Sequence, residues 1–383
     1  MKDHKLIIKT LAGLEPVLSR EVKTLGGKNV KSLKRAVAAE GDIGFIYKAN
    51  IWLRSALRVL VQVQEGFARD EKELYRLVKS VDWENIFAVD KSFAIDVTLY
   101  ASQFHNSLFL AQKAKDAIAD RFRERTGKRP SVNLKQPEVR INVHISNKRC
   151  QISLDSSGDS LHKRRYRRSV DVAPINEVLA AGIILLSDWD GQSSLVDPMC
   201  GSGTFLIEAA MIAYNIPPNV FREDFCFKHW RNYDAELFQL IFDKSLEKER
   251  SFNGEIIGMD VDRRALQKAK NNIERALMQD QIKLLQADLT DLPSELNLPD
   301  KGTVVVNPPY DKKIPAAVEE LYLEMSNSFK DHFQGYSVWV FSASETGLKN
   351  IHLKASRKFT LKNAQLPSWL VGYPIYQPKP ENQ

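Results

Sequence analysis

Residues 195–204 read Leu-Val-Asp-Pro-Met-Cys-Gly-Ser-Gly-Thr. A short apolar run ends on Asp197, two glycines follow at Gly201 and Gly203, and a run of strong helix formers begins at Phe205. We expect a strand, a glycine turn and a helix, the nucleotide-cradling unit of a doubly wound α/β domain. Glycine lets such a turn approach a ligand closely. The spacing fits neither a dinucleotide fingerprint nor a P-loop. An acid at the strand end favours a ligand with a positive or hydrogen-bond-donating group.

A second stretch, residues 303–310, reads Thr-Val-Val-Val-Asn-Pro-Pro-Tyr. It predicts a buried strand that runs into a turn fixed by two prolines, which have no N–H to donate. Carbonyl oxygens at this turn can therefore face a ligand without a competing donor. Asn307 adds a side-chain acceptor, and Tyr310 adds a ring face. The combination is typical of a site that holds a planar group bearing an NH2.

Together the two stretches resemble the class I S-adenosylmethionine methyltransferases that act on exocyclic amines of nucleobases. The resemblance implies S-adenosylmethionine as the cofactor. It also implies catalytic roles for Asn307, Pro308 and Tyr310. Asn307 and the Pro308 carbonyl would accept the two hydrogens of the target amine, and Tyr310 would stack on a base drawn out of its helix or loop. No general base is needed before transfer, so no catalytic histidine is expected.

Acids at the ends of successive expected strands extend this resemblance. Asp260 ends the strand 255–260, at the position that suits ribose hydroxyls, whereas Asp262 is placed to cap the next helix. Asp288 ends the strand 282–288 and resembles the residue that meets the adenine amino group. The implied cofactor-binding residues are Asp197, Gly201, Gly203, Asp260, Asp288 and Asn307.

Length, composition and charge bound the class of protein. The chain has 383 residues, of which 43% are hydrophobic and 27% are charged, and no apolar run is long enough to span a membrane. Cys150, Cys200 and Cys226 show neither metal-ligand spacing nor a disulfide framework. We expect a cytoplasmic, monomeric protein without a structural metal. Cys200 is interpreted as a packing residue, because cysteine nucleophiles of carbon-5 methylation commonly lie in the fourth-strand motif.

Charge is distributed unevenly along the chain. Residues 1–170 carry 33 Lys and Arg against 19 Asp and Glu, whereas residues 171–383 carry 22 against 29. This asymmetry favours two connected modules. The basic module would bind a polyanion, and the acidic module would have a different function. A solvated basic face without a partner is the alternative.

The first half resembles a ferredoxin-like unit over residues 1–66 followed by a THUMP domain, an RNA-binding module, over residues 67–160. Gly13-Leu-Glu matches members of this group. In the first unit we expect strands at 30–39 and 42–48 about a turn at Gly41-Asp42, and a helix at 51–57. The fold class is thus α/β, with a Rossmann-like class I methyltransferase domain over 161–383 behind this α+β half.

Two basic clusters are expected to contact RNA, one at the end of the helix 106–125 and one at the junction of the halves. The alternatives are ordinary helix capping for the first cluster and a charged linker for the second. The junction also resembles the segment that opens the methyltransferase half of the THUMP-methyltransferase group, although Arg165 stands where glycine is usual. The expected RNA-binding residues are Arg121, Arg125, Lys128, Arg129, Lys163, Arg164, Arg165, Tyr166, Arg167 and Arg168.

Two other segments are harder to assign. An aromatic-rich insertion at about 214–250 contains Phe225, Phe227, His229 and Trp230, which we interpret as local packing. After Asn-Pro-Pro-Tyr, the family often has glycine and an acid, but this chain has Asp311-Lys312-Lys313.

The whole arrangement most resembles bacterial 23S rRNA guanine-N2 methyltransferases. The expected function is methyl transfer to the N2 amine of a guanosine in RNA, with rRNA favoured. A tRNA guanine-N2 methyltransferase, an adenine-N6 methyltransferase and a non-catalytic RNA-binding factor stay open as alternatives.

Overall fold

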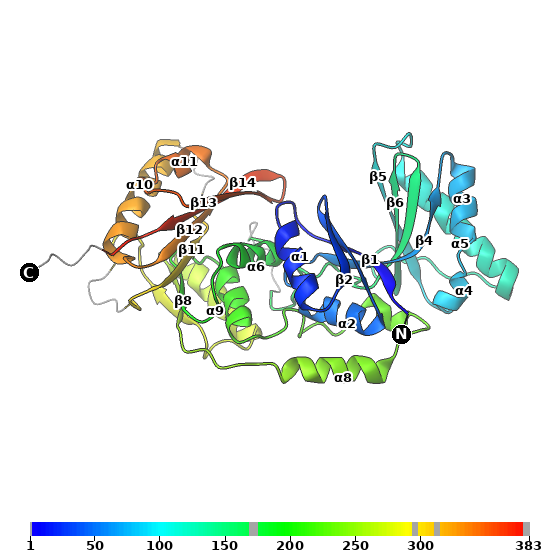
Figure 1. Cartoon of the computed structure of the whole chain (residues 1–383), viewed down its shortest axis with the longest axis horizontal. Helices are drawn as coiled ribbons and strands as arrows, with labels where there is room; N and C mark the ends of the chain where they lie inside the picture. Colours follow the sequence, from blue (N-terminus) through cyan, green and yellow to red (C-terminus); the bar gives the residue numbers. More distant parts are fainter. Residues whose placement is uncertain (1, 168–174, 293–297, 310–314, 378–383) are drawn as a thin grey trace, which may run out of the picture. The chain divides into compact units, whose positions relative to one another are not determined.

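The computed structural model describes residues 2–167, 175–292, 298–309 and 315–377. They form two compact units, and each unit is assembled from separate stretches of sequence. Unit 1 comprises residues 1–10, 18–161 and 222–244, and unit 2 comprises residues 11–17, 162–221 and 245–383. The elements of both are labelled in Figure 1.

Unit 1 is built on a seven-stranded sheet with the order β2-β3-β1-β4-β7-β6-β5. Alternate residues of β6 (Val139, Ile141, Val143 and Ile145) are buried in one core with residues of α3 and α5. The residues between them lie on the opposite face, because successive side chains of a strand alternate. The strands are β1 (His4–Lys9), β2 (Lys28–Leu33), β3 (Ala36–Gly41), β4 (Arg58–Phe67), β5 (Phe93–Tyr100), β6 (Val139–Ser146) and β7 (Arg149–Asp155). The helices of this stretch are α1 (Glu15–Thr24), α2 (Ile43–Trp52), α3 (Glu71–Lys79), α4 (Trp83–Ile86) and α5 (Ser107–Thr126).

The expected strand at 42–48 and helix at 51–57 are wrong, since α2 occupies Ile43–Trp52. The expected strand at 30–39 is in fact two strands, β2 and β3, so the turn between strands lies at residues 34–35 and not at Gly41-Asp42. Asp42 is the N-cap of this helix, and its carboxylate accepts a hydrogen bond from the Phe45 N–H at 2.8 Å. The helix is buried on most of its circumference, so its sequence lacks the amphipathic period that identifies a surface helix. The β-α-β-β-α-β order of the ferredoxin-like region is nevertheless as expected.

The aromatic insertion supplies part of the core of unit 1. Phe225, Phe227 and Trp230 are buried, and the Phe227 ring centroid lies 4.7 Å from that of Tyr47. The interpretation of these side chains as packing residues is confirmed, while His229 is half-buried beside Asp224. The insertion also forms the short helix η1 (Cys226–His229) and α8 (Ala235–Leu246).

Unit 2 contains a second seven-stranded sheet, of order β10-β9-β8-β11-β12-β14-β13. The first five strands in this order are parallel, and β14 and β13 form an antiparallel hairpin at the edge. The strands are β8 (Ser194–Asp197), β9 (Ile256–Asp260), β10 (Lys283–Gln286), β11 (Gly302–Val306), β12 (Ser337–Ser342), β13 (Arg357–Asn363) and β14 (Leu366–Pro374). The helices are α6 (Glu177–Leu186), α7 (Thr204–Ala213), α9 (Arg263–Arg275), α10 (Pro315–His332) and α11 (Glu345–Lys349).

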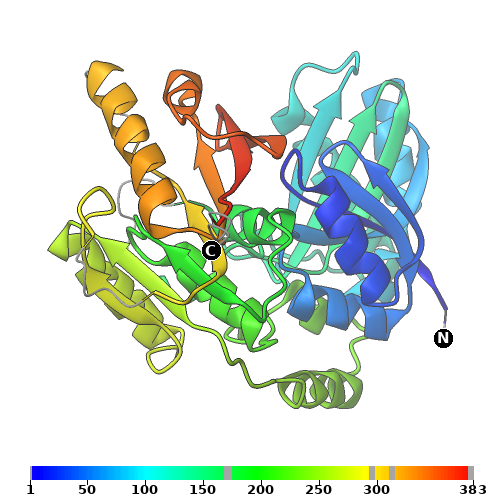
Figure 2. The same cartoon turned by 60° about the vertical axis from the view of Figure 1, so that its left-hand side comes forward.

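Helices cover both faces of this sheet (Figures 1 and 2). Ile257 and Met259 of β9 share a core with α10 and α11. Gly258, which faces the other way, lies so close to Leu206 of α7 that an added Cβ would meet its Cδ1 at 2.2 Å. Strand β8 lies between β9 and β11, so the strand order reverses there. In open parallel sheets, ligands bind in the crevice at this switch point.

Among the described residues, no helix combines the length and the apolar character that a membrane span requires. Within the same ranges, no group of three or more His, Cys, Asp or Glu side chains is arranged to hold a metal ion.

Candidate active site

A cavity of about 800 Å³ lies at the carboxyl ends of the central strands of unit 2. Four of the expected site residues line it together, although they come from three different strand ends. The described lining residues are Pro198, Met199, Asp260, Val261, Asp288, Leu289, Thr290, Asn307, Pro308, Pro309, Leu321 and Glu324. The last two belong to α10, which gives no motif in the sequence, and Thr290 is marked only by its place after Asp288.

The glycine turn is joined to the next strand by one hydrogen bond. The Gly201 N–H donates to Oδ2 of Asp260 at 2.9 Å, which links the turn after β8 to the end of β9. Gly201 and Gly203 have φ angles of +55° and +78°, a region that residues with a Cβ seldom adopt. Gly203 is also the N-cap of α7. The two glycines therefore set the shape of the turn. They are not among the described residues that line the cavity.

Asp197 lies beneath the turn and is 1% exposed. Its Oδ1 accepts a hydrogen bond from the Met199 N–H at 3.3 Å. Burial raises the pKa of this carboxyl well above its ordinary value, and the nearby Asp260 carboxylate raises it further. A cation or a strong donor placed beside Asp197 would reverse this shift.

The Cys200 side chain is 5% exposed, and burial raises the pKa of its thiol far above the ordinary value. A thiol that resists ionisation is a poor nucleophile. Burial therefore agrees with the packing role expected from the sequence.

Asn307 follows β11 at the wall of the cavity. Its Oδ1 is buried and, within the described part of the chain, accepts no hydrogen bond. A buried acceptor without a donor costs about 1–3 kcal/mol, so such an atom is a candidate for ligand binding. Pro308 is buried beside it. Tyr310 and Asp311-Lys312-Lys313 lie outside the described residues.

Asp288 is exposed, and its Oδ1 accepts hydrogen bonds from the N–H and the hydroxyl of Thr290, at 2.9 and 2.8 Å. These bonds fix the carboxylate at the rim of the cavity. Asp262 caps α9 as expected, by accepting from the Arg264 N–H at 2.8 Å.

The basic segment at the junction is partly buried, which corrects two of the expected RNA contacts. Arg164 and Tyr166 are each 1% exposed, so neither side chain can reach RNA in this structure. The Arg164 guanidinium lies 3.5 Å from the Glu208 carboxylate, and the Tyr166 hydroxyl donates to that carboxylate at 3.3 Å. Desolvation favours such pairing, because a lone buried charge is very costly.

Arg167 also makes internal contacts. Its guanidinium donates to the Thr204 hydroxyl at 2.6 Å and pairs with Glu177 at 3.1 Å. Thr204 is the first residue of α7 and directly follows the glycine turn. Arg167 therefore stabilises the end of this turn through its hydrogen bond to Thr204. Lys163 and Arg165 are exposed, and their contact with RNA stays a prediction. Arg168 lies outside the described residues.

Arg165 has a φ angle of +79°. The resemblance noted in the sequence leads us to expect glycine here, and the backbone adopts the left-handed conformation that glycine favours, in spite of the arginine side chain.

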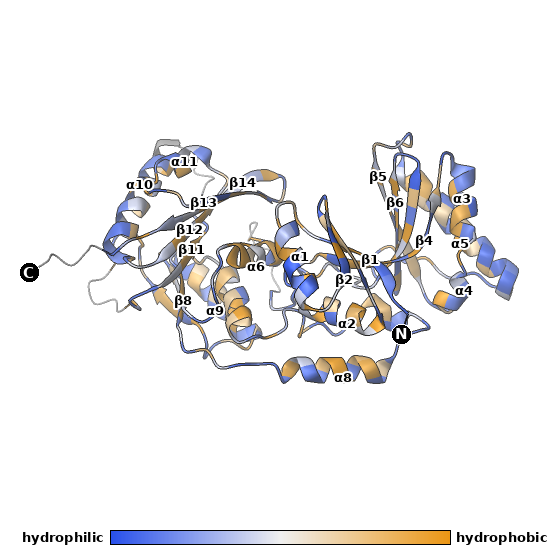
Figure 3. Ribbon diagram, in the orientation of Figure 1, coloured by the Kyte–Doolittle hydropathy of each residue, from blue (hydrophilic) through white to orange (hydrophobic). Residues whose placement is uncertain are grey.

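The other basic cluster lies at the end of α5, where the ribbon in Figure 3 is coloured as hydrophilic. Arg121 is mostly buried and pairs with Asp82 and Glu84, which favours a structural role over RNA contact. Arg125, Lys128 and Arg129 are exposed, and they stay candidates for RNA binding.

Comparison with known families identifies three domains in the chain. The RMKL-like methyltransferase domain matches residues 164–371, the THUMP domain matches residues 68–155, and the RlmL ferredoxin-like domain matches residues 5–60. The chain therefore belongs to the RMKL-like methyltransferase family.

Individual relatives agree with this assignment. A Synechocystis protein named as an RNA methyltransferase is 35% identical over 95% of both chains. The ribosomal RNA large subunit methyltransferase K/L of Methylococcus capsulatus is 37% identical over 95% of this chain and 50% of its own length. The present chain thus spans about half of the K/L relatives that it matches.

Among solved structures, the protein SMU.472, named as a methyltransferase and complexed with SAH, is 32% identical. The TM-score is 0.89, with 99% of this chain and 100% of that chain covered. The expected fold, a class I methyltransferase domain behind ferredoxin-like and THUMP regions, is confirmed.

The burial pattern predicts different outcomes for neighbouring residues of the junction. Replacing Tyr166 with Phe should lower the free energy of unfolding by about 1 kcal/mol, because the hydrogen bond to Glu208 is lost. It should leave the salt dependence of RNA binding unchanged. The double variant Lys163→Ala, Arg165→Gly should instead lower RNA affinity and reduce the salt slope by roughly 1–2.

Chemical denaturation and RNA titrations at several salt concentrations measure both quantities. If the double variant has the same salt slope as the wild type, Lys163 and Arg165 do not contact RNA and belong to a charged linker.

Proposed function

We propose that this protein transfers a methyl group from S-adenosylmethionine to the exocyclic N2 amine of a guanosine in RNA, with the large-subunit rRNA favoured as substrate. Membership of the RMKL-like family supports methyl transfer. The names of its relatives support RNA, and in the K/L relatives large-subunit rRNA, as the substrate. The THUMP region and the basic first half support a polyanionic partner.

The observation that carries the proposal is the buried Oδ1 of Asn307 in the wall of the cavity, which accepts no hydrogen bond from the residues that the structure describes. The two prolines that follow contribute carbonyls and no N–H. An exocyclic amine has two hydrogens to donate, which matches one amide oxygen and one backbone carbonyl.

The residues around the cavity fit S-adenosylmethionine. Asp260 and Asp288 present carboxylates at neighbouring strand ends for hydroxyl and amino groups, and Asp197 lies buried beneath the glycine turn. When bound, the cofactor supplies an electrophilic methyl group on a sulfonium. Its positive charge and amine are suited to a site with three carboxyl groups.

The task of the chain is then mainly to position the target. Asn307 and the Pro308 carbonyl hold the amine and orient its lone pair, a kind of positioning that can supply several kcal/mol of barrier reduction. The nitrogen can lose its proton after transfer, so the site requires no general base. Tyr310 is the proposed stacking partner of the base.

The direct test combines purified protein and labelled S-adenosylmethionine with separate pools of unmodified rRNA, tRNA and DNA, followed by nucleoside analysis. We expect N2-methylguanosine from rRNA. The same nucleoside from tRNA alone would favour the tRNA alternative, and N6-methyladenosine would overturn the choice of guanine. Absence of cofactor binding would favour a non-catalytic RNA-binding factor.

Replacing Asn307 with Ala should lower kcat by about 10²–10³, because a preorganised polar contact to the reacting group is removed. Cofactor affinity should change by only a few fold. Single-turnover transfer and calorimetric binding separate the two effects. Asn271→Ala is a control, since its side chain contacts Gln267 on α9 and is not among the residues lining the cavity. A kcat of the Asn307 variant equal to that of the wild type would contradict the assignment of Asn307 to the site that binds the target amine.

The raised pKa of Asp197 predicts that binding of S-adenosylmethionine is linked to release of a proton. Its raised pKa means that the folded apo protein holds this proton more tightly than the unfolded chain does. The apo protein should therefore lose stability as the pH rises from the ordinary Asp pKa toward the raised value. A cationic ligand favours the ionised form, so affinity for S-adenosylmethionine should increase over the same interval.

Calorimetry in buffers of different ionisation enthalpy measures the released proton. Asp197→Asn should bind more weakly and should flatten the pH dependence. An unchanged pH profile in this variant would show that Asp197 does not carry the linkage.

The monomeric state and the cytoplasmic location expected from the sequence stay predictions. Sedimentation and cell fractionation are the respective measurements.

A further inference from the structure

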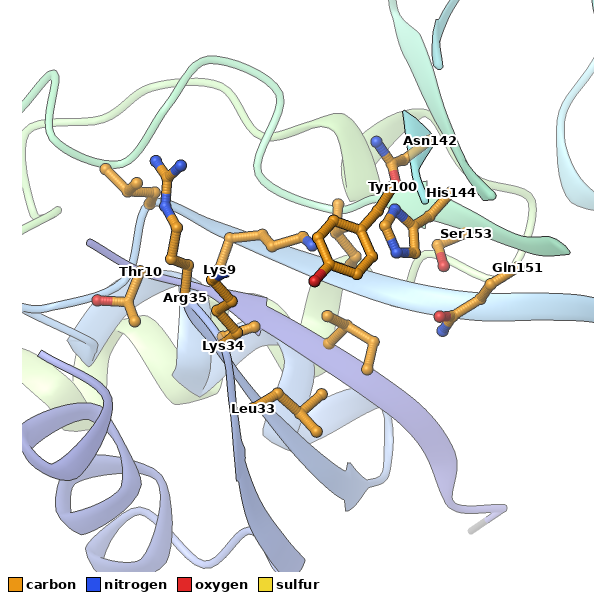
Figure 4. A pocket seen from close by; sticks show the side chains of 14 residues that line it. Lys9, Thr10, Leu33, Lys34, Arg35, Tyr100, Asn142, His144, Gln151 and Ser153 are labelled. Carbon is orange, nitrogen blue, oxygen red and sulfur yellow. The ribbon is translucent and has the colours of Figure 1, made fainter. Parts of the chain in front are cut away.

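Unit 1 contains a second cavity, of about 780 Å³, on its own sheet. It lies on the face opposite the core formed with α3 and α5, since Asn142 and His144 of β6 alternate with the buried residues of that strand. Figure 4 shows its side chains coming from two sides. Lys9, Lys34 and Arg35 lie on one side, from β1 and the β2–β3 turn. Tyr100 and His144, from β5 and β6, lie on the other.

The cavity is positively charged. Lys9, Lys34 and Arg35 line it, and no carboxylate belongs to the lining within the described ranges. Burial lowers the pKa of Lys9, and the neighbouring Arg35 cation lowers it further. An anion placed between these groups would relieve the repulsion between them. Phosphate is the anion that Lys and Arg most often meet on nucleic acids.

The opposite side of the cavity offers an aromatic ring and polar groups. The Tyr100 side chain is 58% exposed, and Lys34 Nζ lies 5.7 Å from its ring centroid. The His144 ring is held by a 2.9 Å hydrogen bond between its Nδ1 and the Thr98 hydroxyl. Burial lowers the pKa of His144, with a smaller effect of Lys9, so this ring favours the neutral form. The amides of Asn142 and Gln151 complete this side.

The backbone that carries these side chains is fixed. The Thr10 N–H donates to the Arg35 carbonyl at 3.0 Å, and the Leu57 N–H donates to the Lys9 carbonyl at 2.7 Å. On the other side, the Asn147 N–H donates to the Tyr100 carbonyl at 3.0 Å. Backbone hydrogen bonds thus hold the end of β1, the β2–β3 turn and the end of β5 in place, which limits the backbone entropy lost on binding.

We propose that this cavity is a nucleotide-binding site separate from the methyltransferase centre. A base stacks on Tyr100, its edge meets the Asn142 and Gln151 amides, and its phosphate lies among Lys9, Lys34 and Arg35. An exposed ring beside cations is the combination by which proteins hold unpaired bases. The favoured source of the nucleotide is a single-stranded stretch of the RNA substrate, so the inference rests in part on the proposed function. A free mononucleotide has the same chemistry and is the second source.

The test measures binding of the full-length protein to a fluorescent single-stranded RNA oligonucleotide, the corresponding duplex and adenosine monophosphate. Tyr100→Ala should weaken binding to the single strand by about tenfold, as expected for the loss of one stacked base. Lys34→Glu should weaken it and lower the salt slope by roughly 1. Phe67→Ala and Lys23→Ala are matched controls, since both residues are exposed and neither lines the cavity.

Each result has a separate meaning. Tyr100-dependent binding of the oligonucleotide without binding of adenosine monophosphate supports RNA as the source. Tyr100-dependent binding of adenosine monophosphate supports a free nucleotide. The proposal is overturned if the Tyr100 variant binds both the single-stranded oligonucleotide and adenosine monophosphate as the wild type does, or if neither protein binds either of these two probes.

Methyl transfer and cofactor binding are followed in parallel. If the site serves the RNA substrate, Tyr100→Ala should raise KM for RNA about tenfold, with kcat and cofactor affinity unchanged. Tyr100-dependent binding in a protein that methylates no RNA would leave this inference standing and remove the proposed function.

Discussion

The hydrogen bond from the Gly201 N–H to Asp260 fixes the geometry on which the active site depends. It ties the turn after β8 to the end of β9, at the point where the strand order of the sheet reverses. The same carboxylate lines the cavity and lies close enough to Asp197 to raise its pKa. One bond therefore sets the turn, orients a ligand-facing acid and contributes to the electrostatics beneath it.

The strand-end residues could be predicted because parallel strands bring their carboxyl ends to one edge of a sheet. Asp260, Asp288 and Asn307 are far apart in sequence, yet each comes at or just after the end of a strand, and they line one cavity. By contrast, Leu321 and Glu324 reach the cavity from the middle of α10. Nothing in the spacing of helical residues indicates which turn of a helix faces a pocket.

Local composition misled the prediction in two places. The segment Ile43–Trp52 is rich in β-branched and aromatic residues, but it forms a helix buried on most sides, where tertiary packing outweighs propensity. The basic run at 163–168 is typical of a surface that contacts RNA. Glu177 and Glu208, which neutralise Arg167 and Arg164, come later in the sequence and reach them only through the fold. Charge counts cannot show such partners.

The core of unit 1 includes Phe225, Phe227 and Trp230, which come after the whole glycine turn and α7 in the sequence. During synthesis, unit 1 therefore cannot complete its interior until residues 222–244 have left the ribosome. By then β8 and α7 of the other unit have already emerged. Unit 1 therefore cannot finish folding before part of unit 2 has been synthesised, although domains usually fold one after another from the N-terminus. A deletion that removes the catalytic half as a single block would also remove part of the interior of its partner.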